Sequence, residues 1–158
     1  MNRTDVLGVE FDNVTMAEAV ERALELIAVR ECRYVVTPNP EIVMLAKENA
    51  ELKRALAGAA LVLPDGVGIV KGAAILGRPM KGKVPGIDFA CGVMARLAEK
   101  GGSVYLFGAK PGVAELAAET LESRYPGLIV AGTSDGYFSD DAPIIEKIRA
   151  AQPDMLLV

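Results

Sequence analysis

The chain contains no histidine, and this absence removes several kinds of chemistry at once. Ser-His and Cys-His nucleophiles both need an imidazole as base, and histidine is also the commonest metal ligand. The two cysteines, Cys32 and Cys91, lie far apart and match no metal-ligand spacing. We therefore expect two reduced thiols in a cytosolic protein rather than a disulfide.

Long apolar runs and basic runs are absent as well. No stretch approaches the ~20 apolar residues of a membrane span, and the N-terminus lacks the charged-then-apolar layout of a signal peptide. The net charge of −4 argues against a nucleic-acid partner. One modest cluster, Arg78, Lys81 and Lys83, is too small for a polybasic anchor but suits a phosphate or an anionic lipid head group.

The chain does contain regular alternation of short apolar segments with helical patterns. Its 158 residues, 51% of them apolar and 24% charged, are enough for one domain with a sizeable core. Strands are predicted at residues 6–9, 34–36, 61–63, 104–107, 128–131 and 155–158, with helices between them. The pattern predicts an α/β fold, a Rossmann-like and mostly parallel sheet with helices on both faces, in a single domain over residues 1–158.

The most informative segment is residues 61–68, where the strand-like Leu-Val-Leu runs into Pro-Asp-Gly-Val-Gly. In a parallel sheet, the loops after the strand ends form the ligand crevice. Polar or glycine-rich residues fill four such loops, at 37–39, 65–68, 108–112 and 132–137, whereas the loops that enter the strands look ordinary. This asymmetry predicts a site along one edge of the sheet.

Each candidate also has a structural interpretation. Asp65 and Asn39 both precede predicted helices, where either side chain is a favoured N-cap, and Thr37 can simply finish its strand. Because all three fall on neighbouring strand ends, we weigh the functional and structural interpretations equally. Lys83 can be a solvated loop charge, and Tyr137 can belong to the core instead of stacking on a ring.

A dinucleotide-binding fingerprint fits the glycines poorly. The run Gly66-x-Gly68-x-x-x-Gly72 is one residue too long, and an acid at its start would repel a pyrophosphate. A Walker-type phosphate loop is absent. A nicotinamide-dependent dehydrogenase therefore remains an alternative, as does a non-catalytic domain that binds a nucleotide sugar or another subunit.

Several motifs taken together resemble the WecG/TagA/CpsF glycosyltransferases, over nearly the whole chain. The motifs are Thr-Pro-Asn-Pro-Glu at 37–41, Leu-Pro-Asp-Gly-Val-Gly at 63–68, Val-Pro-Gly-Ile-Asp at 84–88, Leu-Phe-Gly at 106–108, Tyr-Pro at 125–126 and Asp-Gly-Tyr-Phe at 135–138. The sequence looks most like the TagA-like N-acetylmannosaminyltransferases of wall teichoic acid synthesis. That resemblance implies transfer of N-acetylmannosamine from UDP-N-acetylmannosamine to the 4-hydroxyl of undecaprenyl-diphosphate-linked N-acetylglucosamine, with inversion at the anomeric carbon.

The resemblance also implies roles for particular residues. Asp65 would be the general base, with Thr37 and Asn39 shaping the sugar pocket. Lys83 stands where the family often has arginine, so it can meet a diphosphate only as a point charge. The remaining substrate-binding candidates are two pairs, Gly108 with Ala109 at the diphosphate and Gly136 with Tyr137 at the nucleotide. Because no DxD-type acidic motif is present, we expect neither a metal nor another cofactor.

The family pattern continues beyond Val158 with a C-terminal segment and tail. We therefore expect residues 1–158 to be a truncated glycosyltransferase core, weakly active or inactive by itself. The tail of the family is thought to contact the membrane, which implies a cytoplasmic protein, peripheral on the inner face of the cell membrane. A homo-oligomer is plausible because an uncovered face would be apolar.

Overall fold

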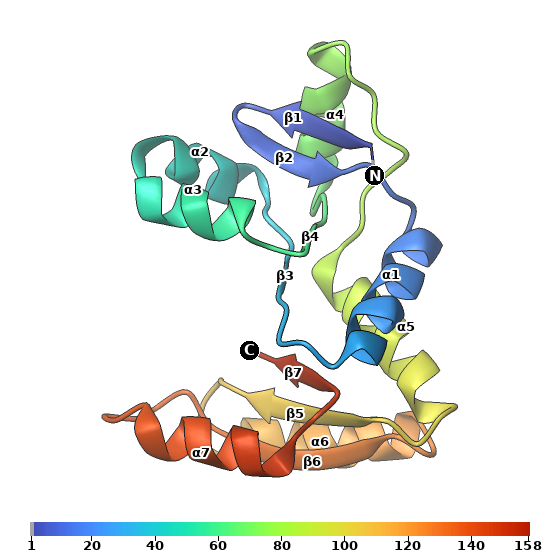
Figure 1. Cartoon of the computed structure of the whole chain (residues 1–158), viewed down its shortest axis with the longest axis vertical. Coiled ribbons are helices and arrows are strands. Elements are labelled where there is room, and N and C mark those ends of the chain that lie inside the picture. Colours follow the sequence, from blue (N-terminus) through green and yellow to red (C-terminus); the bar gives the residue numbers. More distant parts are fainter. Residues whose placement is uncertain (1) are drawn as a thin grey trace. The chain divides into compact units, whose positions relative to one another are not determined.

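The chain forms seven helices and seven strands within residues 2–158, the part that this computed structural model describes (Figure 1). Its internal contacts divide it into two compact units, one ending at Cys91 and the other beginning at Gly92. The boundary falls inside helix α5 (Gly86–Ala98).

The first unit opens with an antiparallel hairpin of β1 (Arg3–Val6) and β2 (Val9–Asp12). Leu7 and Gly8, at φ 55° and 90°, make its two-residue turn, because left-handed turn residues match the twist of paired strands. The predicted single strand over residues 6–9 is therefore wrong. Leucine is an unusual turn residue, and it concealed the turn within an apolar run.

Helices α1 (Met16–Val29), α2 (Pro40–Glu48), α3 (Ala50–Ala57) and α4 (Val67–Ile75) complete this unit with the parallel pair β3 (Val35–Val36) and β4 (Leu61–Val62). A capping box starts α1, since Thr15 and Glu18 exchange side-chain and backbone hydrogen bonds. The hairpin, α2, α3, α4 and β4 enclose a core that includes the buried side chains of Phe11, Val43 and Ile69.

A buried carboxylate joins the hairpin to β4. Asp12 is fully buried, and its Oδ2 accepts the backbone N–H of Val62 at 2.9 Å. Arg3 donates from Nε to Asp12 Oδ1 at 3.1 Å and supplies the compensating charge. A buried charge needs both a partner and hydrogen bonds, and Asp12 has both.

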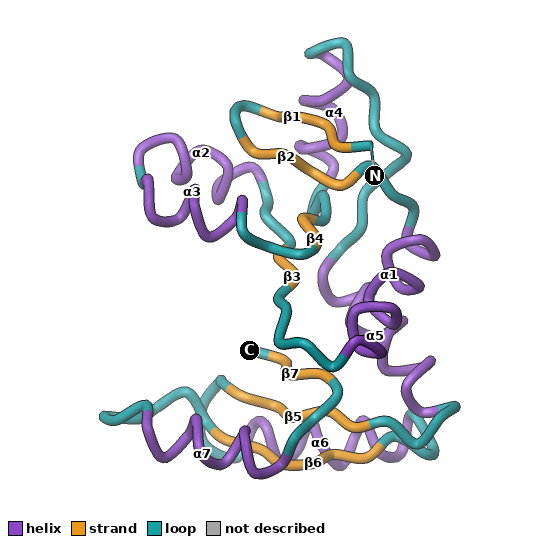
Figure 2. The backbone as a smooth tube through the Cα atoms, viewed as in Figure 1, coloured by secondary structure: helices purple, strands orange, loops and turns teal. Residues whose placement is uncertain are grey.

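The second unit is built on a three-stranded parallel sheet in the order β6-β5-β7, drawn in orange in Figure 2. Its strands are β5 (Ser103–Phe107), β6 (Ile129–Ser134) and β7 (Met155–Leu157), and its helices are α6 (Val113–Arg124) and α7 (Ala142–Ala151). Asp154 fixes β7 against β5, because its Oδ2 accepts the backbone N–H of Ser103 at 2.8 Å.

The predicted α/β class and parallel strand pairing are confirmed. The strands pair in three separate sheets, however, and β3 and β4 share only two residue pairs. A continuous Rossmann-like sheet and a single domain therefore stay predictions.

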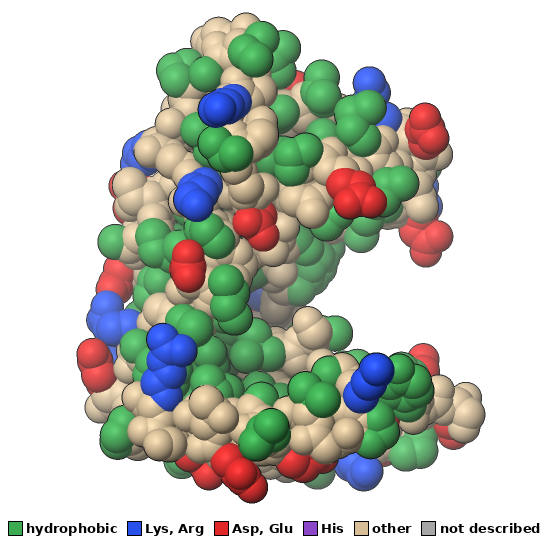
Figure 3. Space-filling view, turned by 180° about the vertical axis from the view of Figure 1, so that it is seen from behind, with side chains coloured by type: hydrophobic (Ala, Val, Ile, Leu, Met, Phe, Trp, Pro, Cys, Tyr) green, Lys and Arg blue, Asp and Glu red, His purple; other side chains and the backbone are tan. Residues whose placement is uncertain are grey.

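The surface and the helices bear on the predicted partners. On the face drawn in Figure 3, lysine and arginine side chains stand singly among acidic, polar and apolar ones. None of the helices within residues 2–158 combines the length and the apolar character needed to cross a bilayer.

Cys32 and Cys91 are both free thiols.

Candidate active site

Three of the predicted site residues lie at one edge of the β3–β4 pair. Val35 and Val36 pair in parallel with Leu61 and Val62, so both strands end at the same edge. Thr37 and Asn39 follow β3, Asp65 follows β4, and all three are partly buried. The prediction that these polar residues occupy neighbouring strand ends is confirmed.

The side chains of Asn39 and Asp65 are used differently. Asn39 caps α2, because its Oδ1 accepts the N–H of Ile42 at 2.9 Å. The N-cap of α4 is Gly66 at φ 93°, and no side chain bonds to the first N–H groups of that helix. Within residues 2–158, the Asp65 carboxylate forms neither a hydrogen bond nor an ion pair. The capping interpretation thus holds for Asn39 but not for Asp65.

Two glycines, Gly68 and Gly86, let the backbone approach the side chains of Pro40 and Thr37 closely. A Cβ on Gly68 would lie 2.7 Å from Cγ of Pro40, so the starts of α2 and α4 touch at this point. A Cβ on Gly86 would lie 2.9 Å from Oγ1 of Thr37, which places the Thr37 hydroxyl against the start of α5. Sequence reasoning missed Gly86 as a site-shaping residue, although a Pro-Gly pair before a helix is a usable signal.

Lys83 reaches this region through its backbone neighbour. Val84 is buried and donates its N–H to the carbonyl of Pro64 at 2.8 Å. This bond joins the residue after Lys83 to the residue before Asp65. The Lys83 side chain is exposed and pairs with no carboxylate among residues 2–158.

The four remaining candidates lie in the second unit, after β5 and β6. Gly108 donates its N–H to the carbonyl of Ser134 at 2.8 Å, and Gly136 donates its N–H to the carbonyl of Ala109 at 2.9 Å. These bonds bring the two loops together. Ala109 has φ 61°, a left-handed conformation that costs a non-glycine residue roughly 1–2 kcal/mol. Backbone strain of this kind is often found in ligand-binding loops.

Tyr137 is one of the residues that line a groove of about 450 Å³ in the same unit. Its side chain is 69% exposed, so the core interpretation does not apply to it. Asp135 holds the local turn by accepting the Tyr137 N–H at 2.8 Å. The groove is lined by a mixture of acidic, hydroxyl, aromatic and apolar residues: Glu115, Thr133, Ser134, Asp135, Tyr137, Phe138, Ser139, Asp140, Pro143, Ile144 and Lys147.

No cluster of three or more acidic or cysteine side chains that could hold a metal ion lies within residues 2–158. The absence of a metal from the reaction stays a prediction, based on the missing DxD motif.

Together these features define an α/β protein with a candidate ligand site at the carboxyl ends of parallel strands. The sequence profile described as "Glycosyl transferase WecG/TagA/CpsF family" matches residues 4–158, and the chain belongs to this family.

Two relatives carry the name N-acetylglucosaminyldiphosphoundecaprenol N-acetyl-beta-D-mannosaminyltransferase. The Bacillus spizizenii protein is 34% identical over 125 residues, which cover 79% of this chain and 49% of that protein. The Staphylococcus aureus protein is 32% identical over 161 residues, which cover 99% of this chain and 62% of that protein. The chain thus spans about half to three-fifths of the length of these curated relatives.

Proposed function

We propose that the chain is the core of an inverting glycosyltransferase that acts on a lipid-linked sugar. The donor is UDP-N-acetylmannosamine, and the acceptor is the 4-hydroxyl of undecaprenyl-diphosphate-linked N-acetylglucosamine. The product is the disaccharide lipid on which wall teichoic acid is built. Family membership and the names of the two relatives support the reaction class and the acceptor.

The observation that carries the proposal is the state of Asp65. Its carboxylate lies at a strand end, partly buried, and it neither caps a helix nor pairs with a cation within residues 2–158. A general base must be within reach of the proton that it removes and must have a free acceptor oxygen. Thr37 and Asn39 lie on the adjacent strand end, where they can border the sugars.

The proposed chemistry is a single displacement. The acceptor oxygen attacks the anomeric carbon from the face opposite UDP, and the Asp65 carboxylate accepts the hydroxyl proton. The bond between the anomeric carbon and the phosphate oxygen breaks, and UDP leaves with the electron pair. Attack from the opposite face inverts the anomeric configuration.

The departing diphosphate needs positive charge or N–H donors. In the first unit, we assign this role to Lys83, whose ammonium is exposed and unpaired among the described residues. In the second unit, the N–H of Gly108 already bonds to the carbonyl of Ser134. Of the two backbone N–H groups predicted to meet the diphosphate there, we therefore keep that of Ala109. Helix α6 follows Gly112 without a side-chain cap, and its first N–H, that of Val113, bonds to the carbonyl of Lys110. The N–H groups that can meet an anion are therefore the next two, those of Ala114 and Glu115.

For the nucleotide, the candidates are the Tyr137 ring and the carbonyl of Gly136, because the N–H of Gly136 already bonds to Ala109. Tyr137 is exposed and lines a mixed polar and aromatic groove, which supports a stacking role for its ring. We also propose a cytoplasmic location at the inner face of the cell membrane, because the acceptor named for the relatives is an undecaprenol lipid. Self-association remains part of the proposal, without a defined number of subunits.

One assay tests the function. The full-length protein is incubated with UDP-N-acetylmannosamine and a lipid-linked N-acetylglucosamine analogue, and UDP release is followed together with the disaccharide product. Transfer supports the proposal. Binding of the UDP-sugar without transfer would instead favour a non-catalytic domain, and an absorbance change with a nicotinamide cofactor would favour a dehydrogenase.

A further inference from the structure

The segment between α4 and α5 carries three cations, and two of them are paired. Arg78 Nη1 lies 3.4 Å from Asp5 Oδ1. Lys81 Nζ lies 2.6 and 2.8 Å from the two carboxylate oxygens of Glu18. Lys83, two residues further on, is the one cation of this segment that has no partner among the described residues.

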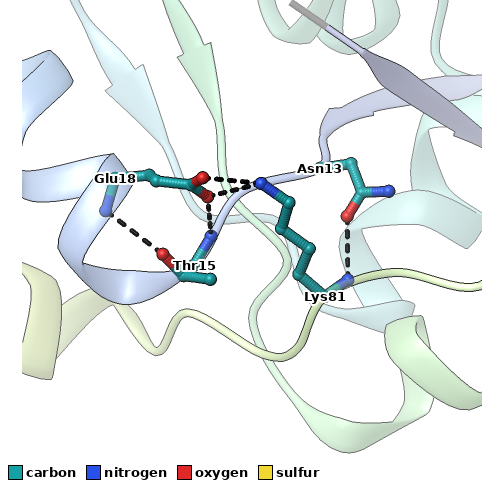
Figure 4. A network of polar contacts seen from close by, with 4 residues as sticks. All are labelled: Asn13, Thr15, Glu18 and Lys81. Carbon is teal, nitrogen blue, oxygen red and sulfur yellow. Dashed lines mark hydrogen bonds and ion pairs between the residues drawn. The ribbon is translucent and has the colours of Figure 1, made fainter.

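Lys81 is held by its backbone as well as by its side chain (Figure 4). Its N–H donates to Oδ1 of Asn13 at 2.8 Å, while Nδ2 of Asn13 donates to the carbonyl of Pro79 at 3.4 Å. The amide of Asn13 therefore binds the segment through both of its ends.

The carboxylate that binds Lys81 is itself fixed. Glu18 Oε2 accepts the backbone N–H of Thr15 at 2.7 Å, and the Glu18 N–H donates to Thr15 Oγ1 at 3.3 Å. Figure 4 shows this capping box at the start of α1, with the ammonium of Lys81 reaching the same carboxylate. Lys81 is thus tied to the end of a helix rather than to a freely rotating side chain.

The far end of the segment is anchored at Val84, whose N–H bonds to the carbonyl of Pro64. Lys83 lies between the anchor at Lys81 and the anchor at Val84. We propose that Lys81, held by Glu18 and Asn13, is a positioning residue that presents Lys83 to the anionic diphosphate of the donor. This inference rests on the proposed function for the identity of the anion.

The ion pair persists over the working pH range of an enzyme. The hydrogen bond from Lys81, followed by that from the Thr15 backbone, lowers the pKa of Glu18 from 4.5 to about 2. Both side chains are nearly half exposed, so the pair contributes little to overall stability. Its loss should therefore appear in the local order of the segment and in substrate binding rather than in unfolding.

Three variants of the full-length protein separate these roles. Lys81→Met removes the anchor, and Lys83→Met removes the presented cation. Arg33→Met is the matched control, because it breaks a similar exposed pair with Glu31 in the same unit. Two measurements are made on each variant: hydrogen–deuterium exchange of the peptide over residues 82–86, and the KM and kcat for UDP-N-acetylmannosamine.

Lys81→Met is expected to speed exchange of that peptide and to lower kcat/KM about tenfold, the size expected for one charge-assisted contact. Lys83→Met should lower kcat/KM to a similar extent while exchange stays at the wild-type rate. The kcat/KM of the double variant should be no lower than that of the more impaired single variant, since both changes remove the same contact. Lys81→Arg should restore wild-type behaviour, and Arg33→Met should match it throughout.

The positioning role would be overturned by unchanged exchange in Lys81→Met. It would also be overturned if the losses of kcat/KM in the two single variants added up in the double variant. A wild-type protein that transfers no sugar would instead sink the proposed function. In that case the Kd for UDP, measured by calorimetric titration, replaces the kinetic constants. The same pattern across the variants then decides the role of Lys81.

Discussion

The two strand-to-helix junctions of the first unit are similar in sequence and different in structure. After β3, Asn39 precedes α2 and bonds to its N-terminus. After β4, Asp65 precedes α4, yet Gly66 takes the cap position and the carboxylate bonds to nothing within residues 2–158. One inserted glycine at φ 93° separates the acid from the helix. Asn39 caps its helix and Asp65 does not, which is why we propose the chemistry for the second junction.

The largest expected effect separates the two junctions by activity. Asp65→Asn should lower kcat by about 10³-fold, because an amide cannot take the acceptor proton and general bases contribute roughly 10²–10⁴-fold. The melting temperature should not change, since Asp65 makes no native hydrogen bond or ion pair among the described residues. UDP release and thermal unfolding are measured on the same preparation. A variant that turns over at the wild-type rate would show that Asp65 is not the base.

The next effect tests the contact between the junctions. Gly68→Ala places a methyl 2.7 Å from Cγ of Pro40 and should destabilise the protein by roughly 1–3 kcal/mol. Gly72→Ala on the same helix is the matched control, because its Cβ would have a 3.8 Å contact with Val6 and helix propensity favours alanine. Urea unfolding of both variants measures the difference. Equal stability of the two would mean that the junctions do not touch.

A smaller effect addresses the cap itself. Asn39→Ala should cost about 1 kcal/mol, the usual loss when a side-chain N-cap is removed. Asn39→Asp keeps an acceptor oxygen and should retain most of the stability, whereas Asp65→Ala should change it by less than about 0.5 kcal/mol. The comparison between the junctions would fail if Asp65→Ala were the more destabilising of the two alanine variants in urea unfolding.

The smallest effect extends the comparison to a third helix start, that of α1, where Glu18 both caps and pairs. Its pKa is lowered to about 2, chiefly by the hydrogen bond from Lys81. The folded state thus holds fewer protons than the unfolded state below pH 4.5, so the stabilisation is present above that pH and is lost as pH falls towards 2. Glu18→Gln keeps the capping pattern without the charge. Its melting temperature should be slightly below wild type at pH 6 and should converge with it near pH 2; a constant gap would exclude the ion pair as the cause.

Local patterns predicted most of the elements because local chemistry determines them. The capping box at Thr15, proline at the first position of α2 and the asparagine between α2 and α3 each leave a signal within four residues. The hairpin turn at Leu7 was missed because an apolar side chain occupies a left-handed position. The order of the strands in the sheets could not be predicted from local sequence either. Pairings as short as that of β3 with β4 depend on contacts between residues distant in sequence.

Within the site, sequence located the strand-end residues but not what their side chains do. Nothing in the local pattern distinguishes Asn39 from Asp65 as a cap, because the difference comes from the backbone of Gly66. The contacts of Lys81 with Asn13 and Glu18 span more than sixty positions and leave no local signal. Such pairs become visible only when the chain is folded.

The buried carboxylate of Asp12 has a consequence for association between chains. The N–H of Leu63 bonds to β3, and the N–H of Val62 bonds to Asp12 instead of to another strand. That acceptor occupies the position at which a foreign strand would dock, so the open edge of β4 is closed to strand addition. The same bond fixes the hairpin register, because a slip by one residue would turn Asp12 to the opposite face and leave Val62 unpaired. A single acidic side chain thus covers this edge of β4.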